Sequence, residues 1–153
     1  MKRILDIVKS LLNEEVEDSP PLPPKGRKSA QEKPQIVKKT WGYEIWMANN
    51  QENNYCGKIL HINKGHRFSM HFHRDKHETF YVLRGKAQLT IIKTETSELK
   101  TLTLEEGDCY VIDRLVPHQV EALEETEIIE SSTFHKDKDS YRVWRDQHIT
   151  YSI

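Results

Sequence analysis

Residues 65–85 read GHRFSMHFHRDKHETFYVLRG and combine closely spaced histidines, two flanking glycines and an apolar run. His71 and His73 are two residues apart, and alternate side chains of a β-strand project from the same side, so both imidazoles can share one ion. Glu78 opens the following run after a short loop, and an antiparallel return brings its carboxylate beside them. The stretch therefore predicts a β-hairpin that carries a metal site.

A second stretch, residues 107–118, offers one more histidine, His118, just past a turn. Two or three histidines with one carboxylate form a nitrogen and oxygen site that suits a divalent ion. Such a site also leaves positions open for water or a ligand. We therefore expect one divalent metal ion as the cofactor, with Zn, Mn, Fe, Co and Ni all remaining candidates.

Short β-type runs surround these histidines from residue 35 onward, and turn residues such as Arg84-Gly85-Lys86 separate them. Their short length and even spacing are typical of an all-β sandwich or barrel, and no helix-length periodic segment interrupts them. The expected runs are residues 36–37, 43–47, 58–62, 79–83, 87–92, 99–104, 109–112, 119–123 and 127–131.

The first 34 residues have a different character. Residues 1–17 place apolar side chains at three- and four-residue spacing, which predicts a short amphipathic helix that needs a docking partner. Residues 18–34 hold five of the six prolines and predict an extended linker. We divide the chain into this helix (1–17), the Pro-rich linker (18–34) and one β-domain (35–153).

The overall composition excludes several classes of protein. Among 153 residues, 23 Lys and Arg face 24 Asp and Glu, so the net charge of -1 argues against a nucleic-acid partner. Asp6 and Lys9 interrupt the N-terminal apolar run, so we expect no secretion signal and no membrane partner. Two cysteines, Cys56 and Cys109, are too few for a disulfide framework and are expected to be buried strand residues. A cytoplasmic protein is predicted.

The spacing of the first motif resembles that of the cupin superfamily at five anchor residues: Gly65, His71, His73, Glu78 and Gly85. In the second cupin motif Gly107 and His118 match, whereas Asp113 and Leu115 stand where the family usually has proline and glycine. The resemblance implies a double-stranded β-helix, the cupin jelly roll. It also implies a metal bound inside the barrel by four residues: His71, His73, Glu78 and His118.

Several further segments resemble the type II cupins of mannose-6-phosphate isomerase: residues 39–44, 56–60, 69–73, 132–135 and 139–142. This resemblance implies a sugar-phosphate aldose–ketose isomerase. In such an enzyme Glu130 or His135 would move the proton between C2 and C1. Lys58, Arg67 and Arg142 would hold the phosphate by charge-assisted hydrogen bonds.

Two alternatives stay open at this point. One is a cupin module that binds a sugar or sugar nucleotide without turning it over, since one fold hosts many functions. The other is a small Fe(II) dioxygenase, because histidines with a carboxylate and open positions also suit oxygen chemistry. In each case we expect a homodimer, since exposed edge strands before Trp46 gain from being covered.

Overall fold

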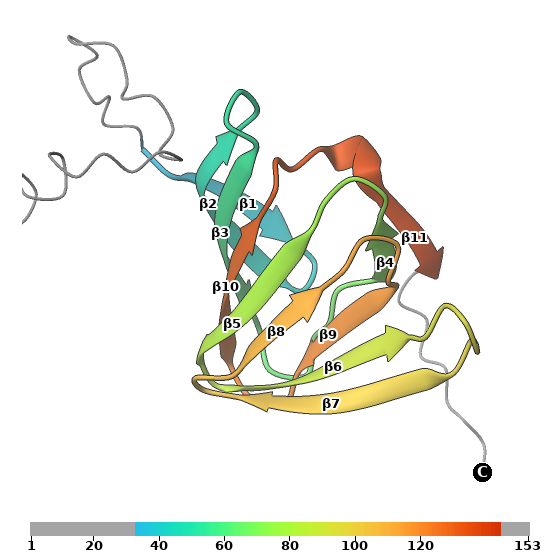
Figure 1. Cartoon of the computed structure of the whole chain (residues 1–153). Helices are drawn as coiled ribbons and strands as arrows, with labels where there is room; N and C mark the ends of the chain where they lie inside the picture. Colours follow the sequence, from blue (N-terminus) through green and yellow to red (C-terminus); the bar gives the residue numbers. More distant parts are fainter. Residues whose placement is uncertain (1–32, 145–153) are drawn as a thin grey trace, which may run out of the picture. The chain divides into compact units, whose positions relative to one another are not determined.

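The computed structural model describes residues 33–144, which form two antiparallel β-sheets facing each other (Figure 1). The first sheet has the order β1 (Gln35–Lys39), β2 (Gly42–Asn50), β3 (Tyr55–Ile62), β10 (Thr126–Ser132), β5 (Glu78–Arg84), β8 (Cys109–Ile112). The second has the order β11 (Ser140–Trp144), β4 (Met70–His73), β9 (His118–Ala122), β6 (Lys86–Ile92), β7 (Leu99–Glu105). A 3₁₀ turn, η1 (Asp137–Asp139), precedes β11.

This architecture confirms the all-β jelly roll expected from the sequence. The expected helix 1–17, and the expected linker up to residue 32, lie outside the described residues. Within residues 33–144 no helix is long and apolar enough to span a membrane.

The hydrophobic core fills the space between the two sheets. Buried and more exposed residues alternate along β3 and β6, as strands with one face on a core require. Leu60 and Phe80 enter the core from the first sheet, and Leu89 and Val120 enter it from the second. Burial of each such side chain contributes roughly 1.5–3 kcal/mol, so this layer supplies most of the stabilisation that fixes the strands around the site.

Gly85 lies where the chain leaves the first sheet at the end of β5 and enters the second sheet as β6. Its φ is +86°, and a Cβ added there would lie 2.2 Å from the backbone oxygen of Glu125. Only glycine fits this conformation and this close approach. The glycine that ends the first motif is therefore required by the crossing between the sheets.

Two details differ from the sequence-based expectation. β11 was not among the expected runs; it is a short edge strand whose residues are mostly exposed. Cys56 is buried as expected, but the expectation for Cys109 was wrong, because this residue is exposed. Cys109 begins β8, the edge strand of the first sheet, where Val111, two residues on, is also exposed.

Candidate metal centre

Three histidine side chains meet between the sheets on two neighbouring strands. His71 and His73 lie on β4, and His118 begins β9 directly opposite His71 in the antiparallel register. One nitrogen atom from each ring lies within 4.8 Å of the other two. The two-residue spacing on β4 and the pairing of β4 with β9 thus bring together the three histidines that the sequence singled out.

Hydrogen bonds to the backbone fix the tautomer of each ring. Every Nδ1 has a carbonyl oxygen as its partner: Ser69 O for His71 at 2.7 Å, Asp139 O for His73 at 2.8 Å and Val116 O for His118 at 3.0 Å. A carbonyl oxygen only accepts, so in the neutral ring the hydrogen sits on Nδ1 and the lone pair on Nε2. Such backbone partners are typical of metal-binding histidines, because they orient the ring and leave the other nitrogen free.

Glu78, the first residue of β5, adds a fourth donor. Its Oε1 lies 3.0 Å from His118 Nε2 and 3.7 Å from His73 Nε2. Glu78 Oε1 and His118 Nε2 are both buried, and neither has a hydrogen-bond partner within the described residues. Two buried lone-pair atoms at this separation repel each other unless a proton or a metal ion lies between them. The donor set therefore fits one divalent metal ion.

The protonation states of these groups also suit a cation. Burial, followed by the nearby charge of a protonated His118, holds the pKa of His71 well below its usual range. Burial also lowers the pKa of His73, although Glu78 opposes this. For Glu78, burial alone would raise the pKa, but the Lys76 ammonium and His118 hold it well below the usual range. At neutral pH the site thus offers the neutral imidazoles of His71 and His73 and the ionised carboxylate of Glu78, as metal binding requires.

Lys76 is a buried residue of the site that the sequence reasoning missed. Its Nζ lies 2.5 Å from Glu78 Oε2 and 2.5 Å from Glu130 Oε1. Burial disfavours the charged ammonium, but the two carboxylates outweigh it and raise the pKa of Lys76 above its usual range. Ser132 Oγ also donates to Glu130 Oε1 at 3.1 Å. Lys76 thus holds one oxygen of Glu78 and leaves the other directed at the histidines.

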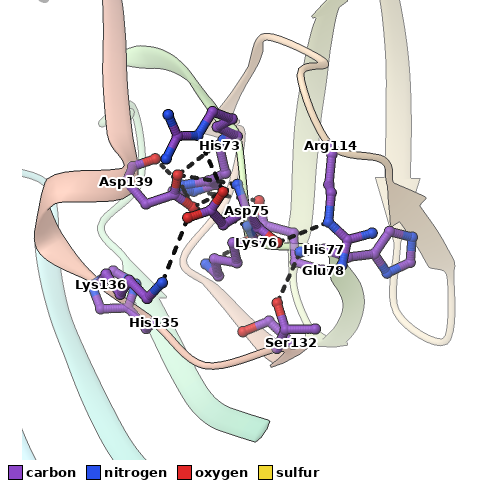
Figure 2. A network of polar contacts seen from close by, with 12 residues as sticks. His73, Asp75, Lys76, His77, Glu78, Arg114, Ser132, His135, Lys136 and Asp139 are labelled. Atoms are coloured by element: carbon purple, nitrogen blue, oxygen red, sulfur yellow. Dashed lines mark hydrogen bonds and ion pairs between the residues drawn. The ribbon is translucent and has the colours of Figure 1, made fainter. Parts of the chain in front are cut away.

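Asp139, in η1, braces the loop that joins β4 to β5 (Figure 2). Its carboxylate accepts backbone N–H groups from Arg74 at 3.0 Å, Asp75 at 3.1 Å and Lys76 at 2.9 Å. Its carbonyl oxygen accepts the Nδ1 hydrogen of His73. One residue therefore positions a metal donor and the loop that carries Lys76. Asp139 was visible in the sequence only as part of the segment 139–142.

The metal donors line a cavity of about 330 Å³. Eight of the nine site residues expected from the sequence line it: His71, His73, Glu78, His118, Lys58, Glu130, His135 and Arg142. The ninth, Arg67, is not a lining residue. It forms an isolated bridge with Glu121, and its guanidinium lies 3.3 Å from the Glu121 carboxylate. The structure thus separates Arg67 from the other expected phosphate contacts.

Lys58 is buried on β3 and projects into the cavity, as its parity with Leu60 predicts. A buried ammonium needs an anion, and within the described residues Glu44 supplies it at 3.5 Å. The Lys58 Nζ also lies 4.2 Å from the ring centroid of Trp46, whose Nε1 donates to Glu44 Oε2 at 2.6 Å. Burial would raise the pKa of Glu44, but Lys58 and Trp46 lower it, so the Glu44 carboxylate is ionised at neutral pH.

His135 reaches the same cavity from the segment between β10 and η1. Asn49 clamps its backbone with two hydrogen bonds, of 2.9 and 3.1 Å. Its Nε2 lies 3.2 Å from Asp137 Oδ1, whereas its Nδ1 is buried without a hydrogen-bond partner among the described residues. Burial, then the charges of Lys58 and Lys76, lower the pKa of His135. The ring is therefore neutral at pH 7, and with Nε2–H donating to Asp137 its Nδ1 is a proton acceptor.

A family model described as a cupin domain matches residues 58–130, which include the four donors, Lys58, Lys76 and Glu130. Solved structures also share the fold of the described residues. Oxalate decarboxylase from Bacillus subtilis superposes with a TM-score of 0.63 at 20% identity, over 72% of this chain and 30% of that one. KdgF from Halomonas sp. superposes with a TM-score of 0.58 at 18% identity, over 70% of this chain and 90% of that one.

A third structure, Lactobacillus farciminis oxalate decarboxylase in a formate complex, gives a TM-score of 0.60 at 16% identity. It is covered over 33% of its length, so this chain spans about a third of the oxalate decarboxylases it matches. One matched structure of the B. subtilis enzyme concerns its Mn(II) centres. Comparison with curated protein sequences gives no match. These likenesses bear on the cupin fold, and the narrower resemblance to mannose-6-phosphate isomerases stays a prediction.

Proposed function

We propose that this cupin domain is a metal-dependent enzyme that moves a proton on a small sugar phosphate. Aldose–ketose isomerisation of a hexose 6-phosphate such as mannose 6-phosphate is the reaction we assign to it. The observation that carries the proposal is that one cavity holds both a cluster of side chains that could hold a metal ion and a buried imidazole nitrogen with no hydrogen-bond partner among residues 33–144. A site that only binds sugar has no need of such a proton acceptor.

A divalent ion held by His71, His73, His118 and Glu78 supplies Lewis-acid polarisation of carbonyl and hydroxyl oxygens. His135 Nδ1 then takes the proton from C2 of the sugar, and the C–H electron pair enters the carbon–carbon bond. The same nitrogen returns the proton to C1 while a hydroxyl proton passes from O2 to O1. Asp137 holds the imidazole in the tautomer that makes this transfer productive.

Glu130 was the other candidate base, and its contacts make it the poorer one. Its Oε1 is already engaged by the Lys76 ammonium at 2.5 Å and by the Ser132 hydroxyl. A carboxylate oxygen held in this way is not free to take a proton from carbon. We therefore assign Glu130 to positioning Lys76 and assign His135 as the base.

The charges of the cavity favour an anionic substrate. Four cations and four carboxylates line it, and their formal charges cancel: Lys39, Lys58, Lys76 and Arg142 against Glu44, Glu78, Glu130 and Asp137. A divalent ion therefore makes the cavity net positive. Arg142 is an exposed lining residue opposite His71 in the β11–β4 register, and it forms no ion pair within residues 33–144. Its guanidinium is thus available for the phosphate.

The size of the cavity favours a monosaccharide. Ligand pockets run from about 300 to 1,000 Å³, and a cavity of about 330 Å³ lies at the lower end of this range. A hexose phosphate suits this space better than a sugar nucleotide does.

The test is proton NMR of the metal-loaded protein with mannose 6-phosphate in deuterated water. We expect fructose 6-phosphate to form and deuterium to enter at C2, and both signals to disappear in His71→Ala and His135→Gln. His77→Gln is the matched control, because His77 lies outside the cavity and contacts Asp113 at 3.1 Å. Broadened sugar resonances without product would overturn catalysis in favour of a binding module. Oxygen consumption with Fe(II) would favour the dioxygenase instead.

A further inference from the structure

Two buried lysines line the cavity, and their surroundings differ. Lys76 Nζ lies 2.5 Å from each of two carboxylates, those of Glu78 and Glu130. Lys58 is only 2% exposed, but among the described residues its Nζ has a single hydrogen-bond partner, Glu44 Oε2 at 3.5 Å. An ammonium group carries three N–H donors. Within the described part of the chain, Lys58 therefore keeps buried donors that are available to a ligand.

Neighbouring side chains on β2 and β3 fix the position of this ammonium. Trp46 pairs with Lys58 in the strand register, and Lys58 Nζ lies 4.2 Å from the centroid of the indole ring. Trp46 Nε1 also donates to Glu44 Oε2 at 2.6 Å, so the indole holds the carboxylate that neutralises Lys58. The His135 ring packs against the same indole, edge to face, with ring centroids 4.9 Å apart. Trp46 thus contacts both Lys58 and the base that we assign, which brings the two groups within the span of one sugar phosphate.

The surroundings of Lys58 suit a neutral oxygen atom better than a phosphate. The Glu44 carboxylate already lies 3.5 Å from the ammonium, and Lys39 Nζ lies 3.3 Å from the other carboxylate oxygen. A phosphate drawn to Lys58 would come close to this carboxylate and be repelled by it. Arg142 also lines the cavity and forms no ion pair among the described residues, so it is the better phosphate partner. The sugar itself is therefore the better partner for Lys58.

We propose that Lys58 opens the pyranose ring of the sugar phosphate and so interconverts its two anomers. The step rests on the proposed function, because a hexose phosphate is mainly a closed ring and only its open chain has the C1 carbonyl that isomerisation needs. Lys58 donates a proton to O5 while the C1–O5 bond breaks and its electron pair stays on O5. An electron pair of O1 forms the C1=O1 double bond, and the neutral amine of Lys58 takes the O1 proton.

One amine is sufficient for both proton transfers, because O1 and O5 are bonded to the same carbon atom, C1. The proton that Lys58 gives is replaced by the one that it receives, so the ammonium is restored and no other reactant is needed. Closure of the ring on the other face of the C1 carbonyl gives the opposite anomer. The step removes no proton from carbon, so it is distinct from the transfer assigned to His135 and is measurable by itself.

The test is two-dimensional exchange NMR of the H1 signals of mannose 6-phosphate with the full chain, first in a chelator and then with divalent metal. We expect the protein to speed exchange between the anomers beyond the rate in buffer. Lys58→Arg keeps the positive charge beside Glu44, but a guanidinium does not give up its proton. We therefore expect the protein-dependent exchange to fall at least about 100-fold in this variant.

Lys58→Met, which removes the charge as well as the proton, is the second variant, and circular dichroism checks that both variants fold. Lys93→Met is the matched control, because Lys93 pairs with Glu98 at 3.1 Å and neither residue lines the cavity. We expect this control to exchange the anomers at the wild-type rate.

Binding of 1,5-anhydromannitol 6-phosphate, whose ring cannot open, separates ring opening from phosphate binding. We expect Lys58→Arg to bind it with a dissociation constant similar to that of wild type. Wild-type exchange no faster than in buffer, or full exchange in both Lys58 variants, overturns the proposal. Weaker binding with unchanged exchange of the bound sugar also overturns it, because Lys58 then holds the phosphate. The spectra with metal also show whether fructose 6-phosphate forms, so failure of isomerisation is distinguished from failure of ring opening.

Discussion

Replacing Lys76 by methionine tests the central electrostatic element of the site. The side chain is 4% exposed, and its ammonium is the shared partner of Glu78 and Glu130, each at 2.5 Å. Methionine keeps much of the length but removes the charge, so two buried carboxylates lose their cation. Breaking a buried ion pair from one side costs about 3–5 kcal/mol. For a domain of this size that corresponds to a fall in the melting temperature of roughly 10–20 °C.

The assay is thermal unfolding with and without added divalent metal, after treatment with a chelator. Lys86→Met is the matched control, because Lys86 pairs with Glu105 at 2.6 Å on the surface and its removal is expected to change stability little. In Lys76→Met a metal ion supplies the missing positive charge, so added metal is expected to raise the melting temperature more than in wild type.

The pH dependence of the stability gives this prediction a direction. The pKa of Glu78 is depressed in the folded wild type, so its contribution is present above the unfolded pKa of about 4.3 and is lost as the pH falls through the folded pKa. The difference in the free energy of unfolding between wild type and Lys76→Met is therefore largest near neutral pH and becomes smaller in acid. The reasoning is refuted if Lys76→Met is as stable as Lys86→Met in the presence of the chelator. It is also refuted if added metal leaves the difference in melting temperature between wild type and Lys76→Met unchanged.

Three further predictions follow from the packing and the braces around the site. Asp139→Asn is expected to weaken metal binding about 10–100-fold in a chelator competition, because it loosens the segment whose carbonyl oxygen holds His73. Asp137→Asn is the control and is expected to keep the metal affinity. Equal affinities in the two variants would contradict this prediction. Gly85→Ala is expected to lower the free energy of unfolding in urea several times as much as Gly65→Ala does. Both glycines have a positive φ, but an added Cβ has open space at Gly65 and meets backbone atoms at Gly85. Similar losses in the two variants would refute the steric argument. Phe80→Ala, at 1% exposure, is expected to cost about 3–5 kcal/mol by chemical denaturation, and a loss below about 1 kcal/mol would contradict its place in the core.

Local rules explain why the histidine cluster was predictable. His71 and His73 share a face because side chains alternate along any strand, whatever the strand packs against. Glu78 follows the loop that turns the chain back, and Gly85 sits where a crossing requires a positive φ. The structure places His71, His73, Glu78 and His118 around one point, as their spacing along the chain indicated.

Pairings between distant segments explain what was missed. Glu44 reaches Lys58 across the β2–β3 pair, and Asp139 reaches the 74–76 backbone from more than sixty residues away in the chain. Arg67 shows the converse, because its residue type suits phosphate but its bridge to Glu121 holds it outside the cavity. None of these three contacts follows from residue type or spacing, because each depends on which segments become neighbours in the fold.

The sequence by itself determined the fold class and the cluster of histidines with Glu78, because hydrophobic alternation, turn glycines and the spacing of these side chains all act over a few residues. Only the tertiary structure decided which cations and carboxylates share the cavity. It alone showed that Lys76 holds the second oxygen of Glu78 and that, within the described part of the chain, His135 Nδ1 has no hydrogen-bond partner. The physical reason is that burial and low dielectric give these long-range contacts their strength, and burial exists only once the two sheets have packed.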